Sequence, residues 1–168
     1  FGANPAYCPN ARVMPLSDNH DALVSAVDAL PAIGGTAGHL GVQWAWNLVS
    51  PNWASTWGGD SAPVSYDQVR SHKVLKAVVL MTDGEFNTRF HGPQSPEQAE
   101  RLCDAMKAEG VVVFSVGFGI GGNATAIDTL RNCATAGPEY FANASNAAEL
   151  DAAFARFADK LTGLRLSQ

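Results

Sequence analysis

The chain has 168 residues, of which 46% are hydrophobic and 16% are charged, a composition typical of globular proteins rather than disordered segments. This length predicts a single domain over residues 1–168 with a substantial core. The net charge of −5 argues against nucleic acid or an anionic membrane surface as a partner. No apolar run approaches the roughly 20 residues that cross a bilayer. The chain opens on Phe1 without a methionine or a signal peptide, so we expect it to be part of a larger protein.

The first third predicts a short strand and two helices. A strand is expected at Ala11–Leu16, and Ser17 and Asp18 can cap an amphipathic helix at Asn19–Leu30. A Gly-Gly-Thr loop at 34–36 then leads into a helix at about 37–49, at the start of which Thr36 is either an N-cap or an oxygen ligand for an ion. His39 has no serine or cysteine partner that the sequence identifies.

Residues 50–72 have no clear periodicity and contain Trp53 and Trp57. A stretch of this length without a pattern is typical of a functional or covering loop. Exposed tryptophans would form a partner surface, whereas buried ones would cover the core, and the sequence leaves both interpretations open.

The central motif of the chain is an apolar run followed by acidic residues. Ala77–Met81 is rich in β-branched residues and predicts a strand buried on both faces. Thr82, Asp83, Gly84 and Glu85 follow directly, at the carboxyl end of this strand, where open α/β sheets bind ligands. Gly84 is expected to permit the tight turn that directs Asp83 outward.

The next segment predicts a helix and a second apolar strand. Ser95 and Gln98 form a capping-box pattern at the start of the helix, Gly110 ends it, and Val111–Val116 follows as a strand.

Gly117–Gly122 then matches G-x-G-x-x-G before a helix at about 124–136, the context of a dinucleotide-binding loop. That fingerprint belongs on the first strand-to-helix turn, with an acidic residue at the end of the next strand. Here it lies late in the chain, so a plain glycine-rich loop is the favoured interpretation.

The chain closes with a short edge strand at 139–142, a helix at Ala147–Leu161 and a tail at Leu164–Leu166 that adds more strand. Cys103 and Cys133 fall on the apolar faces of consecutive helices, either as buried thiols or as a disulfide, which we favour. A disulfide would imply an oxidising compartment. Cys8 would then be either unpaired or paired with something outside this chain.

Strands and helices alternate, and the connections are too long for hairpins. This order predicts a doubly wound, mostly parallel α/β sheet with helices on both faces. The Gly34–Thr36 and Asp83–Glu85 loops would both lie at its carboxyl edge.

This combination resembles the von Willebrand factor A domain. The segments GGTAGHLGVQWAWNLVSP, KAVVLMTDGEFNT and LCDAMKAEGVVVFSVGFG, together with the closing LRLSQ, resemble the C-terminal part of TadG-type pilus-assembly proteins from about Val13 onward. In the A-domain family, a divalent cation binds at the metal-ion-dependent adhesion site. By resemblance, Thr36 and Asp83 match its second-loop threonine and third-loop aspartate, and Glu85 ranks below them. Such oxygen donors suit Mg²⁺, with Mn²⁺ and Ca²⁺ as alternatives.

The family's first-strand Asp-x-Ser-x-Ser motif occurs nowhere in this chain. The resemblance therefore implies an N-terminally incomplete domain, in which the strand carrying that motif, with its helix, lies upstream of Phe1. Without it, the two remaining ligands make an incomplete cation site, because Mg²⁺ requires a near-octahedral shell.

The resemblance implies a non-enzymatic adhesion module in Flp/Tad pilus assembly at the bacterial envelope, periplasmic and with a membrane-anchored parent protein. We expect it to bind a pilus or envelope protein at the Asp83 and Thr36 edge. One alternative is a nucleotide-dependent enzyme that uses Gly117–Gly122. Another is a structural scaffold whose contact surface is Trp53 and Trp57.

Overall fold

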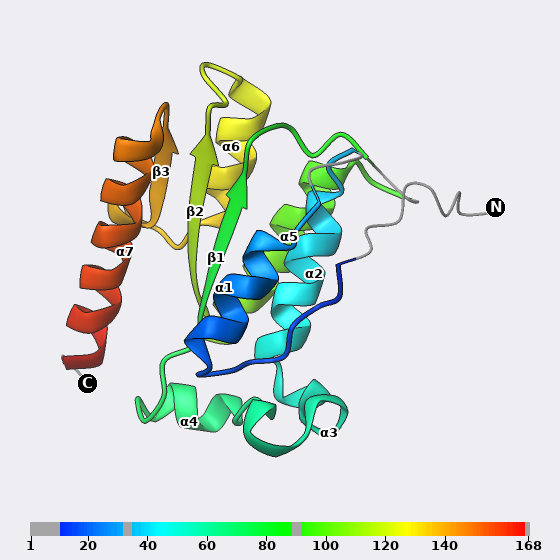
Figure 1. Cartoon of the computed structure of the whole chain (residues 1–168), viewed down its shortest axis with the longest axis vertical. Helices are drawn as coiled ribbons and strands as arrows, with labels where there is room; N and C mark the ends of the chain where they lie inside the picture. Colours follow the sequence, from blue (N-terminus) through cyan, green and yellow to red (C-terminus); the bar gives the residue numbers. More distant parts are fainter. Residues whose placement is uncertain (1–10, 32–34, 89–91, 167–168) are drawn as a thin grey trace.

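The computed structural model describes residues 11–31, 35–88 and 92–166. Its centre is a three-stranded parallel sheet in the order β1 (Ala77–Thr82), β2 (Val112–Phe118) and β3 (Phe141–Ala144). Helices cover both faces (Figure 1). The predicted doubly wound parallel α/β fold is therefore confirmed.

Helices connect the strands and pack back on the sheet. The connection from β1 to β2 contains α5 (Ser95–Ala108), and that from β2 to β3 contains α6 (Ala124–Cys133). Together with α2 (Gly38–Val49), α5 covers one face, while α7 (Ala147–Leu166) covers the other (Figure 1). All three strands point the same way, so the loops that follow them meet at one edge of the sheet.

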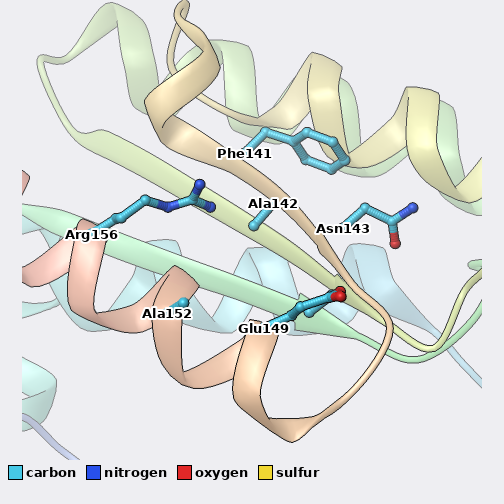
Figure 2. Close-up of a pocket in the computed structure, with 7 residues that line it drawn as sticks. Phe141, Ala142, Asn143, Glu149, Ala152 and Arg156 are labelled. Carbon is cyan, nitrogen blue, oxygen red and sulfur yellow. The ribbon is translucent and has the colours of Figure 1, made fainter.

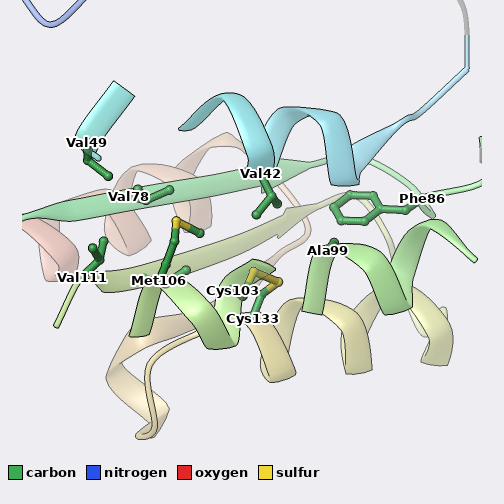
Figure 3. Packing of buried hydrophobic residues seen from close by; sticks show 10 residues of the cluster. Val42, Val49, Val78, Phe86, Ala99, Cys103, Met106, Val111 and Cys133 are labelled. Carbon is green, nitrogen blue, oxygen red and sulfur yellow. A yellow bond between two sulfur atoms is a disulfide. The ribbon is translucent and has the colours of Figure 1, made fainter. Parts of the chain in front are cut away.

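The larger part of the core lies between the sheet and the layer of α2 and α5. Figure 3 shows its side chains spread along the space between the strands and these helices, with a disulfide between Cys103 and Cys133 among them. Both cysteines are fully buried, and the bond joins α5 to α6. Cys8 lies outside the described residues. On the opposite face, Phe114 of β2 packs against Phe157 of α7, with ring centroids 4.7 Å apart.

The N-terminal region differs from the prediction. Residues 11–19 form no strand, and Val13 and Leu16 are exposed, because no neighbouring strand in the described structure pairs with them. The helix α1 (His20–Asp28) does form, but Asn19 is its N-cap and its side chain accepts a hydrogen bond from the Ala22 N–H. None of its residues is buried, so the expected apolar face has no covering partner here.

The irregular stretch after α2 contains short helices. They are η2 (Pro51–Trp53), α3 (Ala54–Trp57), η3 (Gly59–Ser61) and α4 (Tyr66–Arg70). Lys76 fastens this segment to the body, because its buried ammonium donates hydrogen bonds to the carbonyls of Val49 and Val64 and lies 4.7 Å from the Tyr66 ring centroid. The segment therefore covers Lys76, and the contacts of the Lys76 ammonium attach it to the rest of the domain.

β1 is not buried on both faces as its sequence predicts. Val79 and Met81 are 42% and 47% exposed, whereas Val78, on the other face, is buried. Within the described residues β1 pairs with β2 alone, so it is an edge strand. Its exposed face lies beyond the reach of α7, which packs on β2 and β3.

Several element ends also differ. α6 ends at Cys133 rather than near residue 136, and β3 starts at Phe141, because η4 (Pro138–Tyr140) occupies the residues before it. The predicted tail strand is wrong: α7 continues through Leu166, and Leu161 still packs on the core. In the part of the chain that the structure describes, no helix combines the length and the apolar character needed to cross a membrane.

Candidate functional site

The loop after β1 places Asp83 on the surface at the carboxyl edge of the sheet. The Thr82 hydroxyl shapes this turn, because it donates to the Gly84 carbonyl at 3.0 Å and lies 3.3 Å from the Gly84 N–H, which donates to it. Gly84 does not adopt a positive φ, and a Cβ there would meet nothing within 4 Å. The expected role of Gly84 is therefore wrong: a threonine hydroxyl makes the turn.

The loop before α2 is joined to the loop after β1. The Thr36 N–H donates to the Asn87 side-chain oxygen, and the Thr88 N–H donates to the Thr36 carbonyl, both at 3.1 Å. Beside them, Phe86 is buried against Gly38, where an added Cβ would lie 2.2 Å from the ring. These contacts bring the two predicted polar loops to the same edge.

The Thr36 side chain is not an N-cap. The N-cap position of α2 is Ala37, and no side chain makes a capping hydrogen bond there. Among the described residues the Thr36 hydroxyl has no hydrogen-bond partner. It is half-buried, beside the loop that carries Asn87.

Glu85 is tied to the neighbouring loop. Its carboxylate accepts a hydrogen bond of 2.6 Å from the Asn123 side chain, whose own oxygen caps α6 at the Ala126 N–H. The sequence analysis did not single out Asn123 or Asn87. An asparagine directly before a helix is a detectable signal for Asn123, but the link to Glu85 depends on the folded arrangement.

His39 does have a serine partner. Its Nδ1 lies 2.7 Å from the Ser95 Oγ, and the two side chains belong to residues that are 4% and 1% exposed. The expectation of a capping box at Ser95 is wrong, because Gln94 is the N-cap and Ser95 faces inward. Burial lowers the pKa of the His39 imidazole, and with both residues inaccessible the pair fastens α2 to α5 rather than forming a nucleophilic site.

The edge thus contains two kinds of polar side chain. Thr82, Glu85 and Asn87 are held by hydrogen bonds within the protein. The Asp83 carboxylate and the Thr36 hydroxyl have no such partner among the described residues. Both are hard oxygen donors that suit Mg²⁺ or Ca²⁺. No group of three or more His, Cys, Asp or Glu side chains that could hold a metal occurs in the described ranges.

The family model of the von Willebrand factor type A domain matches residues 10–156. The chain belongs to this family. A comparison with curated proteins found no match. Von Willebrand A domains are generally interaction modules without enzymatic activity that bind protein partners. The parallel α/β sheet and the position of the Thr36 and Asp83 loops at its carboxyl edge agree with this assignment.

The glycine-rich loop of this A domain, Gly117–Gly122, is held in place by contacts within the loop and with β3. The Ile120 side chain lies over Gly117, where a Cβ would come within 2.3 Å of it, and Ile120 is buried. The Gly119 N–H donates to the Ala144 carbonyl, and the Asn143 side chain donates to the Gly121 carbonyl. Ile120 therefore packs over Gly117, the first glycine of the motif, whereas a Cβ on Gly119, the second glycine and the one that a pyrophosphate would approach, would meet nothing within 4 Å.

Trp53 and Trp57 lie far from the carboxyl edge of the sheet. Trp53 and Trp57 are half-buried and stack with ring centroids 6.2 Å apart, and Trp57 donates to the Asn47 carbonyl. They belong to η2 and α3, at the end of the sheet opposite the arrowheads of the strands (Figure 1). The structure does not bring them together with Thr36 and Asp83, so they would form a separate surface.

Proposed function

We propose that this von Willebrand A domain recognises a protein partner at the carboxyl edge of its sheet, through Asp83 and Thr36. The observation that carries the proposal is the contrast at this edge. The neighbouring polar side chains are engaged within the fold, whereas the Asp83 carboxylate and the Thr36 hydroxyl remain available to an outside group.

Thr36 and Asp83 would contribute two oxygen ligands to a divalent cation, with Mg²⁺ the best match to hard donors. A bound cation would offer an open coordination position to a carboxylate of the partner. Two protein ligands leave most of an octahedral shell to be filled by water and by other oxygens. Glu85 is not assigned as a ligand, because its carboxylate accepts a hydrogen bond from Asn123.

The finer assignment is to a TadG-type protein of Flp/Tad pilus assembly. It rests on the order and spacing of the motifs that lead from the Gly-Gly-Thr loop to the closing helix. In this proposal an upstream strand with the Asp-x-Ser-x-Ser motif supplies the missing oxygens and pairs with the free edge of β1. The buried Cys103–Cys133 disulfide supports an extracytoplasmic location, because disulfides persist in oxidising compartments.

Calorimetric titration of the chain with Mg²⁺ and with Mn²⁺ tests the cation site. We expect saturable binding that disappears in Asp83→Ala and weakens in Thr36→Ala. Asp60→Ala is the matched control, because Asp60 is an exposed carboxylate in η3, outside this edge. Binding that is equally strong in Asp83→Ala would contradict the proposed site.

If the chain alone binds no cation, the same titration on a polypeptide extended at the N-terminus tests whether the upstream strand supplies essential ligands.

Partner recognition has its own test. A pull-down of Tad pilus and envelope proteins should depend on Asp83 and Thr36. Unchanged partner binding in the Asp83→Ala/Thr36→Ala variant would show that another surface is used.

A further inference from the structure

A second candidate binding surface lies at the other edge of the sheet, between β3 and α7. An open groove of about 370 Å³ runs along the outer side of β3 (Figure 2). It is lined by four residues of β3 and three of α7: Phe141, Ala142, Asn143, Ala144, Glu149, Ala152 and Arg156. Within the described residues β3 pairs with β2 only, so this edge of β3 is free.

The backbone of β3 has hydrogen-bonding groups on its free side. The Gly119 N–H donates to the Ala144 carbonyl, which fixes the polar groups of Ala144, and by alternation those of Ala142, toward β2. The N–H and C=O groups of Phe141 and Asn143 therefore point away from β2. An extended chain that lies in the groove can pair with them as a fourth strand.

The side of the groove formed by α7 has about the same length as β3. Glu149, Ala152 and Arg156 follow one another at i, i+3 and i+7 and form one stripe on α7. The stripe from Glu149 to Arg156 and the strand from Phe141 to Ala144 each span about 10 Å. Ala152, in the middle, is small and exposed, so it leaves room for a side chain of a bound peptide.

The two ends of the groove carry opposite charges. At the carboxyl end of β3, Glu149 accepts hydrogen bonds from the Ser145 N–H at 2.7 Å and the Asn146 side chain at 3.1 Å, and the backbone hydrogen bond keeps the pKa of its carboxyl below the usual value. At the amino end, the exposed Arg156 has no ion-pair partner in the described structure.

Two further cations lie near the amino end of β3, at Phe141 and η4. The guanidinium of Arg131 lies 5.1 Å from the centroid of the Phe141 ring. Lys160, one turn after Arg156, is neutralised by Glu139 at 2.9 Å. Of Arg156 and Lys160, Arg156 is therefore the cation that remains available to an anionic group in the groove.

We propose that this groove binds the extended carboxyl-terminal segment of a partner protein, which adds to β3 as an antiparallel strand with its terminal carboxylate at Arg156. The charges determine the direction of the bound peptide. A peptide whose carboxyl terminus lies at Arg156 runs from Ala144 toward Phe141 and is therefore antiparallel to β3. The position of the terminus follows from the strand: before Phe141 the backbone forms η4, so strand pairing stops where Arg156 lies. This surface is independent of the proposed Asp83 and Thr36 site.

Selection from a phage library of random heptapeptides displayed with free carboxyl termini tests the proposal, with selected peptides then synthesised and titrated by fluorescence anisotropy. We expect amidation of the terminal carboxylate to weaken binding about tenfold or more, the loss expected for a charge-assisted pair. Arg156→Glu should abolish binding of these peptides, and a new selection on that variant should yield peptides with lysine at or near the end.

Ala152→Trp should block every selected peptide by filling the groove, while Arg12→Glu, an exposed arginine outside it, should have no effect. The amide signals of Phe141 and Asn143 should shift on peptide addition, and Asp83→Ala should leave binding unchanged. The proposal is overturned if no peptide is enriched, if the Arg156→Glu and Ala152→Trp variants bind as well as the unaltered chain, or if peptides with internal acidic residues and blocked termini bind equally.

Discussion

His39 lies within hydrogen-bond distance of Ser95 through one ring nitrogen, while its other nitrogen, Nε2, is buried and has no hydrogen-bond partner among the residues that the structure describes. A charged imidazole in this position would lose its hydration, so burial lowers its pKa below the ordinary value of 6.5. As the pH falls through that ordinary value, the unfolded chain takes up the proton first. The free energy of unfolding should therefore decrease from about pH 7 downward, until the pH passes the pKa of the folded state.

Urea unfolding at several values between about pH 5 and pH 7.5 measures this dependence. His39→Phe removes the titrating group, so its free energy of unfolding should vary less over this range. His20→Gln is the control, because His20 is exposed at the start of α1. An unchanged pH dependence in His39→Phe would show that another group is responsible.

At the scale of one element, α2 contains two glycines with opposite surroundings. A Cβ on Gly38 would lie 2.2 Å from the buried Phe86 ring, whereas one on Gly41 would meet nothing within 4 Å. We expect Gly38→Ala to lower the free energy of unfolding by about 1–3 kcal/mol through overpacking. Gly41→Ala should raise it by roughly 0.5–1 kcal/mol, because alanine is the better helix former.

Urea unfolding of the two variants under the same conditions provides the comparison, and each is the control for the other. Equal effects from both substitutions would mean that the contact between α2 and the loop after β1 adjusts to the added methyl group without a loss in the free energy of unfolding. A destabilised Gly38→Ala would show that this contact, which also brings Thr36 to the sheet edge, is rigid.

For the elements in general, the sequence patterns predicted which helices and strands form better than they predicted how deeply these elements are buried. The apolar spacing in α1 and the apolar run in β1 correctly indicated a helix and a strand. Both patterns also predicted burial, and in the described structure the large apolar side chains of α1 (Leu23, Val24 and Val27) and Val79 of β1 are exposed. A pattern records which face is suited to burial, whereas burial itself requires a second surface, which no local pattern specifies.

For the whole molecule, the Cys103–Cys133 disulfide links the two helices that flank β2, across 30 residues of chain. Cross-links of this kind stabilise mainly by restricting the unfolded chain, typically by about 2–4 kcal/mol. We therefore expect reduction with dithiothreitol to lower Tm by roughly 5–15 °C. Differential scanning calorimetry with and without reductant measures the change.

The Cys103→Ala/Cys133→Ala variant should have a Tm that does not respond to the reductant. Cys8→Ser should retain the full response. A response that persists in the double variant would assign the effect of the reductant to something other than this bond.

The candidate edge could be predicted because it depends on topology. The end of an apolar strand places Asp83 at the carboxyl edge, and a Gly-Gly-Thr loop before a helix places Thr36 near it. Contacts between distant residues could not be predicted in this way. His39 and Ser95 are 56 positions apart, and Ile120 covers Gly117 only because the loop folds back. Such pairs depend on how the helices pack.

Lys76 provides a chemical measure of how often the covering segment of short helices after α2 opens. Its ammonium is buried under that segment and bonded to two carbonyls, and burial lowers its pKa. An amine-modifying reagent in solution can react with this atom only after the segment has lifted away, whereas the exposed Lys73 reacts without any opening. The ratio of the two acylation rates therefore expresses how often this layer opens in the folded protein.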